Sequence, residues 1–143
     1  MTNSVLCAVD VSAGDDDIKV IRKAAQLAGL DGAQLDVIGV VPDFGMSQVG
    51  AFFDSDHHDK MVAEAKEHQN ALVIKALDVA QNDKVRHVIA TGRAYEEVLN
   101  LAKQTEASLI VVGAHKADIS DYLLGPNAAR IVRHATCSVH VVR

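Results

Sequence analysis

Two kinds of apolar pattern alternate along the chain, and this alternation limits the folds that it can adopt. Short apolar runs, typical of strands buried on both faces, are separated by longer stretches in which apolar residues recur at helical spacing. Such an alternation predicts a parallel sheet with helices on both faces, joined by right-handed crossovers. We therefore expect an α/β fold with three α/β/α layers and a parallel sheet in the common strand order 3-2-1-4-5. The five predicted strands are residues 5–9, 34–41, 85–90, 109–112 and 139–142.

The helical stretches lie between these strands, and we predict helices over residues 15–28, 58–81, 95–104 and 127–134. The first begins with three acidic residues, which the positive end of a helix dipole favours. The longest is predicted to bury one stripe, composed of Met61, Ala65, His68, Leu72, Ala76 and Val79. Residues 43–56 contain glycines and no sustained period, so we expect a loop there.

The length of 143 residues, without a linker, repeat or low-complexity segment, predicts a single domain spanning residues 1–143. Apolar residues make up 49% of the chain and aromatic residues only 3%, so the core has to be built from Val, Ile, Leu and Ala. The net charge of −5 argues against nonspecific binding of nucleic acid, which needs a basic face.

The first residues lack a basic segment followed by a long apolar run, which argues against a signal peptide. No stretch approaches the roughly 20 apolar residues that span a bilayer. We therefore expect a soluble, cytoplasmic protein. Cys7 and Cys137 are too few, and too apolar in context, for a disulfide framework, so buried thiols are expected.

The last part of the chain carries the strongest candidate site. Gly113 ends a predicted strand, a polar loop containing Lys116 follows, and Gly125 and Pro126 precede the last predicted helix. A glycine lets a ligand approach the backbone closely, and the free N–H groups at a helix start suit a phosphate. Asn127 adds a donor or a helix cap. This pattern alone leaves two readings open, a phosphate site and a tight turn in a small α/β domain.

The predicted strand order gives this loop a definite position. In the order 3-2-1-4-5 the direction of winding reverses between strands one and four, and such sheets bind ligands at the carboxyl ends of the strands near this point. The loops after Asp10 and Gly113 would then face one crevice. Asp10 is therefore a candidate ligand contact, and its structural alternative is a strand-end turn or a helix cap.

Several segments of the chain follow one family pattern. They are the start at Val9, Asp10 and Ser12, the end of the second predicted strand at Val40, the stretch "TGRAYEEVLNLAKQTEASLIVVGAH", and the tail "RHATCSVHVVR". Over its whole length the chain resembles the universal stress protein family, and "AHKADISDYLLGPNAARIVRHA" is closest to the short bacterial, ATP-binding F/G-type branch. The resemblance implies a Rossmann-like, adenine-nucleotide alpha hydrolase-like fold. It also implies a site for ATP or AMP, with Mg²⁺ as an accompanying ion.

Carried over position by position, the resemblance implies which residues meet the nucleotide. Those near the adenine and the ribose would be Ala8, Val9, Asp10, Val40, Val112 and Gly113. Those near the phosphates, or closing the opposite side, would be Ala114, His115, Lys116, Gly125, Pro126 and Asn127.

Two residues depart from the G-x2-G-x9-G-[ST] pattern of the nucleotide-binding members. Lys116 stands at the second glycine, where the F/G-type branch also carries a basic residue. Pro126 stands where the family usually has Ser or Thr, and proline supplies neither a hydroxyl nor an N–H. The N–H groups of Asn127 and Ala128 remain, so we expect weakened rather than abolished binding.

The resemblance implies a regulatory protein that changes its assembly or its affinity for a partner when it binds nucleotide. Family members dimerise, often through the last strand, and "SVHVVR" would form the exposed edge of a homodimer or a higher homo-oligomer. The chain also resembles the family members that accompany an ectoine-type osmolyte TRAP transporter. This implies a transporter subunit as partner and a role in osmoregulation within the stress response.

An enzyme, such as a weak ATPase or a nucleotidyl transferase, is the alternative function. Only His115 and Asp10 are candidate bases, and the chain has no G-x4-G-K-[ST] loop, so no catalytic residue is assigned. A phospho-receiver shares the element order, but the third predicted strand ends in "ATG" and offers no acceptor aspartate. A flavodoxin needs a Ser/Thr-rich phosphate loop where this chain has the acidic "DVSAGDDD".

Seven histidines raise the question of a metal site. His57, His58 and His68 lie near the start of the longest predicted helix, but no cysteine and no H-E-x-x-H spacing supports zinc there. We therefore predict no metal site, and a solvated helix end at these histidines.

Overall fold

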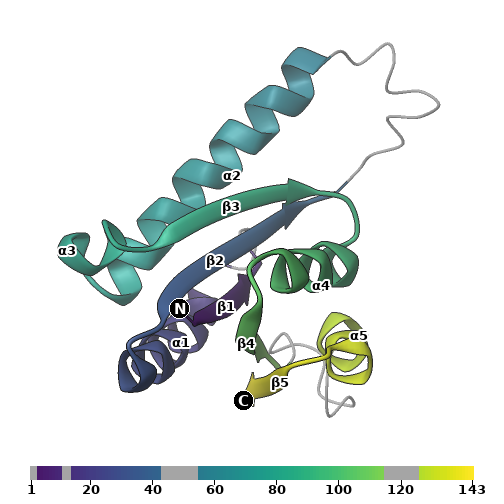
Figure 1. Ribbon diagram of the computed structural model, residues 1–143. Helices are drawn as coiled ribbons and strands as arrows, with labels where there is room; N and C mark the ends of the chain where they lie inside the picture. Colours follow the sequence, from purple (N-terminus) through teal and green to yellow (C-terminus); the bar gives the residue numbers. More distant parts are fainter. Residues whose placement is uncertain (1–2, 11–13, 43–54, 115–125) are drawn as a thin grey trace.

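Five parallel strands form one twisted sheet in the order β3-β2-β1-β4-β5 (Figure 1). The computed structural model describes residues 3–10, 14–42, 55–114 and 126–143. The predicted α/β fold and strand order are confirmed, and each predicted strand is present within two residues at either end. The strands are β1 (Ser4–Val9), β2 (Gln34–Val41), β3 (Arg86–Thr91), β4 (Ala107–Gly113) and β5 (Ser138–Val142).

Helices cover both faces of the sheet, because successive strand residues point to opposite sides (Figure 1). Val5 and Cys7 of β1 pack in a core with α1 and α2, whereas Leu6 packs in a second core with α4 and α5. Both cores consist mainly of Val, Ile, Leu and Ala, as the composition predicts. The helices are η1 (Gly14–Asp17, a 3-10 turn), α1 (Ile18–Asp31), α2 (Ser55–Ala76), α3 (Val79–Asn82), α4 (Ala94–Gln104) and α5 (Pro126–His134).

The first helical stretch differs from the prediction at both ends. Its acidic start forms η1, and α1 continues to Asp31, three residues past the predicted end. Gly32 then ends the helix in the left-handed conformation with φ of 61°, which glycine adopts without a steric penalty.

The prediction of one helix over residues 58–81 was wrong at its C-terminal end. α2 stops at Ala76, and Asp78 starts the separate short helix α3 by accepting a hydrogen bond at Oδ1 from the backbone N–H of Gln81, at 2.7 Å. This bond lowers the pKa of the Asp78 carboxyl. The predicted stripe fails at two positions, because His68 is exposed and Val79 is 60% exposed.

A network of polar side chains lies around Gln69, a buried residue of α2. Gln69 of α2 is fully buried, and its Nε2 lies 3.1 Å from the carbonyl oxygen of Val37 and 3.0 Å from Nδ1 of His87. The Nε2 atom of His87 lies 2.7 Å from Oδ1 of Asn82. Because an amide N–H₂ only donates and a carbonyl oxygen only accepts, these contacts fit a neutral His87 with its proton on Nε2. The network thus connects β2, α2, α3 and β3 around an uncharged imidazole.

We expect stability to fall as His87 gains a proton. Burial lowers the pKa of His87 below its ordinary value of about 6.5, and the nearby charge of Lys66 lowers it further. The unfolded chain therefore binds this proton more readily. The stability that comes from keeping His87 uncharged is fully present above about pH 6.5. It is lost as the pH falls from there through the pKa of His87 in the folded state.

Chemical denaturation at several pH values between about 5 and 7.5 measures this effect. The free energy of unfolding of His87→Gln should change less with pH than that of the unsubstituted chain. His134→Gln, at an exposed histidine that ends α5, is the matched control and should keep the original pH dependence. Equal pH dependence in His87→Gln and the unsubstituted chain would show that His87 is not the titrating group.

Candidate functional site

A cavity of about 1380 Å³ opens at the carboxyl ends of the strands. It includes the ends of β1 and β4, at Val9 and Gly113, and these strands are the neighbours between which the winding direction reverses. This is the position at which open parallel sheets bind ligands. Its volume exceeds the roughly 300–1,000 Å³ of ordinary small-molecule pockets, so it has room for a nucleotide-sized molecule.

The structure brings most of the sequence-predicted site residues to this cavity. They come from three strands or strand ends, those of β1, β2 and β4, and from the start of α5. His115, Lys116 and Gly125 lie outside the described residues. The predicted residues that line the cavity are Ala8, Val9, Asp10, Val40, Val112, Gly113, Ala114, Pro126 and Asn127.

One side of the cavity is apolar. We call it the apolar wall: it is formed by the sheet face under α4 and α5 and by those two helices, at Ala8, Ile38, Val40, Ala94, Val98, Val112, Ala128 and Ile131. Surfaces of this kind suit a planar ring, because they remove apolar area from water without leaving polar groups unpaired. Arg130 of α5 stacks over the Tyr95 ring of α4, 4.9 Å from its centroid, and so helps to hold these two helices together.

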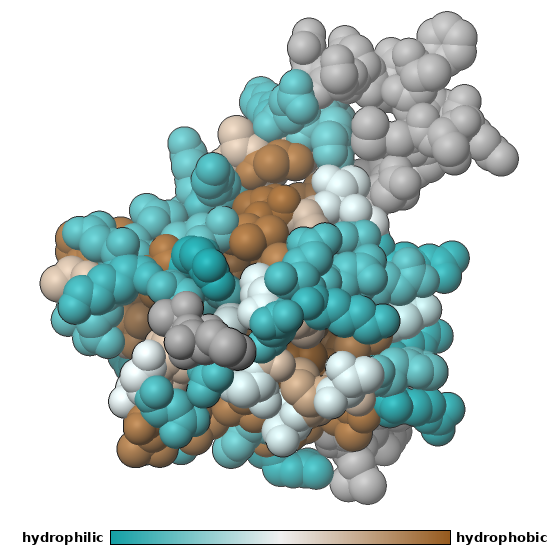
Figure 2. Space-filling view, in the orientation of Figure 1, coloured by the Kyte–Doolittle hydropathy of each residue, from teal (hydrophilic) through white to brown (hydrophobic). Residues whose placement is uncertain are grey.

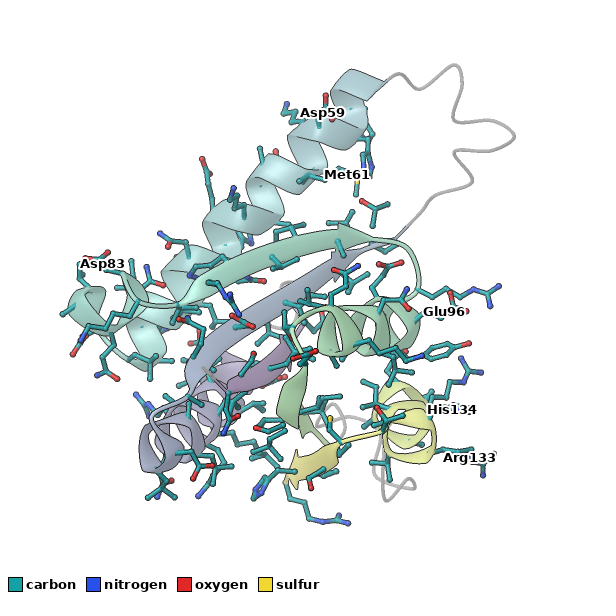
Figure 3. All side chains as sticks on the ribbon, in the orientation of Figure 1. Asp59, Met61, Asp83, Glu96, Arg133 and His134 are labelled. Carbon is teal, nitrogen blue, oxygen red and sulfur yellow. The ribbon has the colours of Figure 1, made fainter. Side chains whose placement is uncertain are left out.

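The opposite side of the cavity is charged. The charged wall consists of side chains from η1, α1 and α2, namely Asp15, Asp16, Asp17, Lys19, Arg22, Glu64 and His68. Apolar residues lie among them, including Met61 on the N-terminal half of α2 (Figure 3). Figure 2 shows hydrophobic residues gathered beside α2, over β3, with hydrophilic residues around them.

Asp10 and Asp17 are joined where β1 ends. The backbone N–H of Asp10 donates to Oδ2 of Asp17 at 2.6 Å, so the Asp17 carboxylate fastens the strand end to the turn before α1. Both residues line the cavity. Asp17 therefore borders the cavity next to Asp10, the ligand contact that the sequence predicts.

Gly113 is the last residue of β4 and does not have a positive φ. A Cβ at this position would lie 3.4 Å from Cγ2 of Val20 and 3.6 Å from Oδ1 of Asp17, which are ordinary van der Waals distances. The fold itself therefore tolerates a side chain there. The bare backbone of Gly113 adjoins the cavity, and a ligand could lie directly against it.

Among the described residues near Gly113 and the start of α5, fewer backbone donors face the cavity than the sequence suggests. The backbone N–H of Ala114 donates to the carbonyl oxygen of Val142 at 2.8 Å, so it is not available to a phosphate. α5 begins at Pro126, which has no N–H, and both Pro126 and Asn127 are exposed at the cavity. The first helical N–H groups come from Asn127 and Ala128.

Sequence reasoning missed the contribution of α1 and α2. The run Asp15–Asp17 was a visible signal, but a favourable helix start explains such a run equally well. Met61 and Ala65 belonged to a predicted buried stripe, and nothing local shows that this stripe also borders a cavity.

The described part of the chain brings no three His, Cys, Asp or Glu side chains together in a metal-binding group. His134 lies at the exposed end of α5, beside Arg133 and away from the sheet (Figure 3). Cys7 is fully buried, and desolvation, with the nearby Asp17 charge, raises the pKa of its thiol far above the usual value. The Cys7 thiol therefore stays protonated and is no nucleophile.

Within the described ranges, none of the helices combines the length and the apolar character needed to cross a membrane.

Comparison with known proteins gives one family over the whole chain. A model of the universal stress protein family matches residues 1–143. The chain is similar to universal stress protein A homolog 1 of Coxiella burnetii, 30% identical over 138 residues that cover 96% of this chain and 94% of the relative. It is also similar to universal stress protein G of Shigella flexneri, 26% identical over 144 residues that cover 100% of both.

Solved structures share the fold. A universal stress protein from Archaeoglobus fulgidus in complex with dAMP has a TM-score of 0.63 at 17% identity, covering 99% of this chain and 98% of that one. A universal stress protein in complex with cAMP has a TM-score of 0.69 at 19% identity, covering 99% and 97%.

Proposed function

Because this chain belongs to the universal stress protein family, we propose that it binds an adenine nucleotide, ATP or AMP, in the cavity at the carboxyl ends of its strands. Mg²⁺ would accompany the triphosphate. The bound nucleotide would regulate assembly or partner binding, and the protein would carry out no obligatory chemical step. The observation that carries the proposal is a large cavity at the winding reversal, lined by most of the residues that the family pattern implies.

The two walls suit the two ends of a nucleotide. The apolar wall suits an adenine ring, since aliphatic side chains from the sheet and from α4 and α5 line it. Polar and backbone groups at Asp10, Gly113 and Asn127 lie at the strand ends and at the start of α5, where the ribose and the phosphate would follow. The relatives solved with dAMP and cAMP support an adenine nucleotide as the ligand class.

Isothermal titration of the purified full chain tests the proposal. We expect AMP to bind with a dissociation constant below about 1 mM. Ribose 5-phosphate, which lacks the base, is the control and should bind at least about tenfold more weakly, because it leaves the apolar wall exposed to water. No heat of binding with either AMP or ATP at millimolar concentration would contradict the proposed function.

We further propose a homodimer that pairs along β5. This strand lies at the edge of the sheet, next to β4, and a sheet edge presents unpaired N–H and C=O groups to a second copy. Native mass spectrometry should show a dimer for the unsubstituted chain. Val141→Pro removes a backbone donor from β5 and should shift the population towards monomer. A dimer that is unaffected by this substitution would place the interface elsewhere.

A membrane transporter for an osmolyte such as ectoine is the partner that we propose, from the resemblance to transporter-associated members of the family. Co-purification with a TRAP transporter subunit, with and without nucleotide, tests this step. Recovery that depends on nucleotide would support a regulatory role. Failure to recover the subunit under both conditions would count against it.

A further inference from the structure

The middle of α2 is attached to the sheet through one amide group. α2 lies along β3 (Figure 1), and Nε2 of Gln69 lies 3.1 Å from the carbonyl oxygen of Val37 in β2 and 3.0 Å from Nδ1 of His87 in β3. Gln69 is fully buried, and its Oε1 atom has no hydrogen-bond partner among the described residues. Both contacts with the sheet therefore depend on one nitrogen atom, which can only donate.

A proton on Nδ1 of His87 is incompatible with this pair of contacts. If the amide keeps its orientation, the new N–H of His87 faces the N–H₂ group of Gln69, and two donors meet. If the amide rotates, Oε1 of Gln69 accepts from His87 but also faces the carbonyl oxygen of Val37, and two acceptors meet. In either orientation α2 loses one hydrogen bond to the sheet and brings two like groups together.

The other side-chain contacts between these elements tolerate the proton. Nε2 of His87 donates to Oδ1 of Asn82 in both states, so α3 stays connected to β3. Near the carboxyl end of β3, Oγ1 of Thr91 lies 3.0 Å from Nε2 of His58 in α2, and a hydroxyl can either donate or accept. The cost of protonating His87 therefore falls on the contacts of Gln69 with the sheet.

The charged groups around His87 do not offset this cost. The nearby positive charge of Lys66 in α2 disfavours a second one on the imidazole. Arg86 precedes His87 in β3, so it points to the other face of the sheet, where it pairs with Asp36 of β2. The charged residues that flank α3 are exposed to water, and they are Asp78, Asp83 and Lys84.

We infer that the contact between α2 and the sheet is a proton-sensitive switch, in which protonation of His87 loosens α2 while the strands stay paired. Four residues of α2 that precede Gln69 line the cavity, namely Met61, Glu64, Ala65 and His68. Mild acidification would therefore displace one wall of the cavity without unfolding the sheet. The inference holds whichever ligand the cavity binds.

Hydrogen exchange of the full chain, measured by mass spectrometry from about pH 7.5 to about pH 5, tests the inference. After correction for the intrinsic pH dependence of exchange, we expect the protection of α2 to fall roughly tenfold as His87 is protonated. α4 packs on the opposite face of the sheet and should keep its protection, so it is the internal reference. The ring ¹⁵N chemical shifts of His87 give the pH midpoint of its protonation, and the loss of α2 protection should share this midpoint.

Two substitutions separate His87 from the other titrating groups. His87→Gln places an uncharged amide in β3 and should make α2 protection independent of pH over this range. His134→Gln, at the exposed end of α5, should keep the response of the unsubstituted chain.

The unsubstituted chain alone can overturn the inference. Unchanged α2 protection while the ring shifts show a protonated His87 would do so. An equal loss of protection in α2 and α4 would do so as well, because it indicates global unfolding rather than a local switch. A fall of the original size in His87→Gln would assign the effect to another group.

Discussion

Replacing Asp36 by alanine is expected to lower the free energy of unfolding by about 3 kcal/mol and the melting temperature by about 10 °C. Asp36 of β2 is only 1% exposed, and its carboxylate accepts a hydrogen bond from Ser4 Oγ of β1 at 2.6 Å. Arg86 of β3 contacts both carboxylate oxygens, at 2.5 and 2.8 Å. The change would leave the buried Ser4 hydroxyl without its acceptor and remove the side-chain contacts that link β1, β2 and β3 beside their backbone pairing.

The matched control is an ion pair on the surface. Lys75→Ala removes the contact with Asp15, in which the two side chains are 60% and 63% exposed, and should cost less than about 1 kcal/mol. Chemical denaturation of both variants measures the difference. A loss for Asp36→Ala no larger than that for Lys75→Ala would show that the contacts of the buried Asp36 carboxylate contribute nothing beyond an ion pair with both partners exposed.

Replacing Gly113 by alanine is expected to weaken AMP binding by about tenfold while leaving the fold intact. The added methyl group meets Val20 and Asp17 at ordinary contact distances, so the protein does not need to rearrange. A ligand lying against the Gly113 backbone would have to move away by about the size of that methyl group. The unfolding free energy should stay equal or rise by a few tenths of a kcal/mol, because alanine restricts the unfolded chain.

Gly29→Ala provides the control for this experiment. Gly29 lies in α1, outside the residues that line the cavity, and a Cβ there would meet no atom within 4 Å. This variant should gain up to about 1 kcal/mol of stability and keep the original affinity for AMP. If Gly113→Ala also binds AMP as the unsubstituted chain does, the ligand does not lie against this part of β4.

Much of the fold could be predicted because its determinants are local. Apolar runs such as "SVLCAV" in β1 and "QLDVIGVV" in β2 are short and continuous, and they alternate with helical periods. The order of the strands was not encoded in these local patterns, and the prediction took the order that is common among five-stranded folds of this type. The break between α2 and α3 was missed, because the apolar period continues through Leu77 and Val79, whereas Asp78 caps the new helix. A capping aspartate three residues before Gln81 was the available signal.

The candidate site could be predicted only on the sheet side. The family pattern follows the strand ends and the start of α5, so it indicated residues such as Val40, Gly113 and Asn127. The charged wall depends on how α1 and α2 pack beside the sheet, and a helix surface looks the same in sequence whether it borders a cavity or water. The contact between buried Asp36 and exposed Arg86 was likewise not predictable, since it joins residues 50 positions apart through strand register.

An adenine nucleotide is proposed to occupy the cavity at the carboxyl ends of the strands. Backbone amide chemical shifts of the ¹⁵N-labelled chain, recorded during titration with AMP, test this proposal residue by residue. We expect the largest shift changes at Ala8, Val112, Gly113 and Ala128, which line the cavity. We expect little change at Arg86 and Ala107, the first residues of β3 and β4, at the amino ends of the strands. Shift changes that gather at the amino ends of the strands, or no change at millimolar AMP, would contradict the proposal.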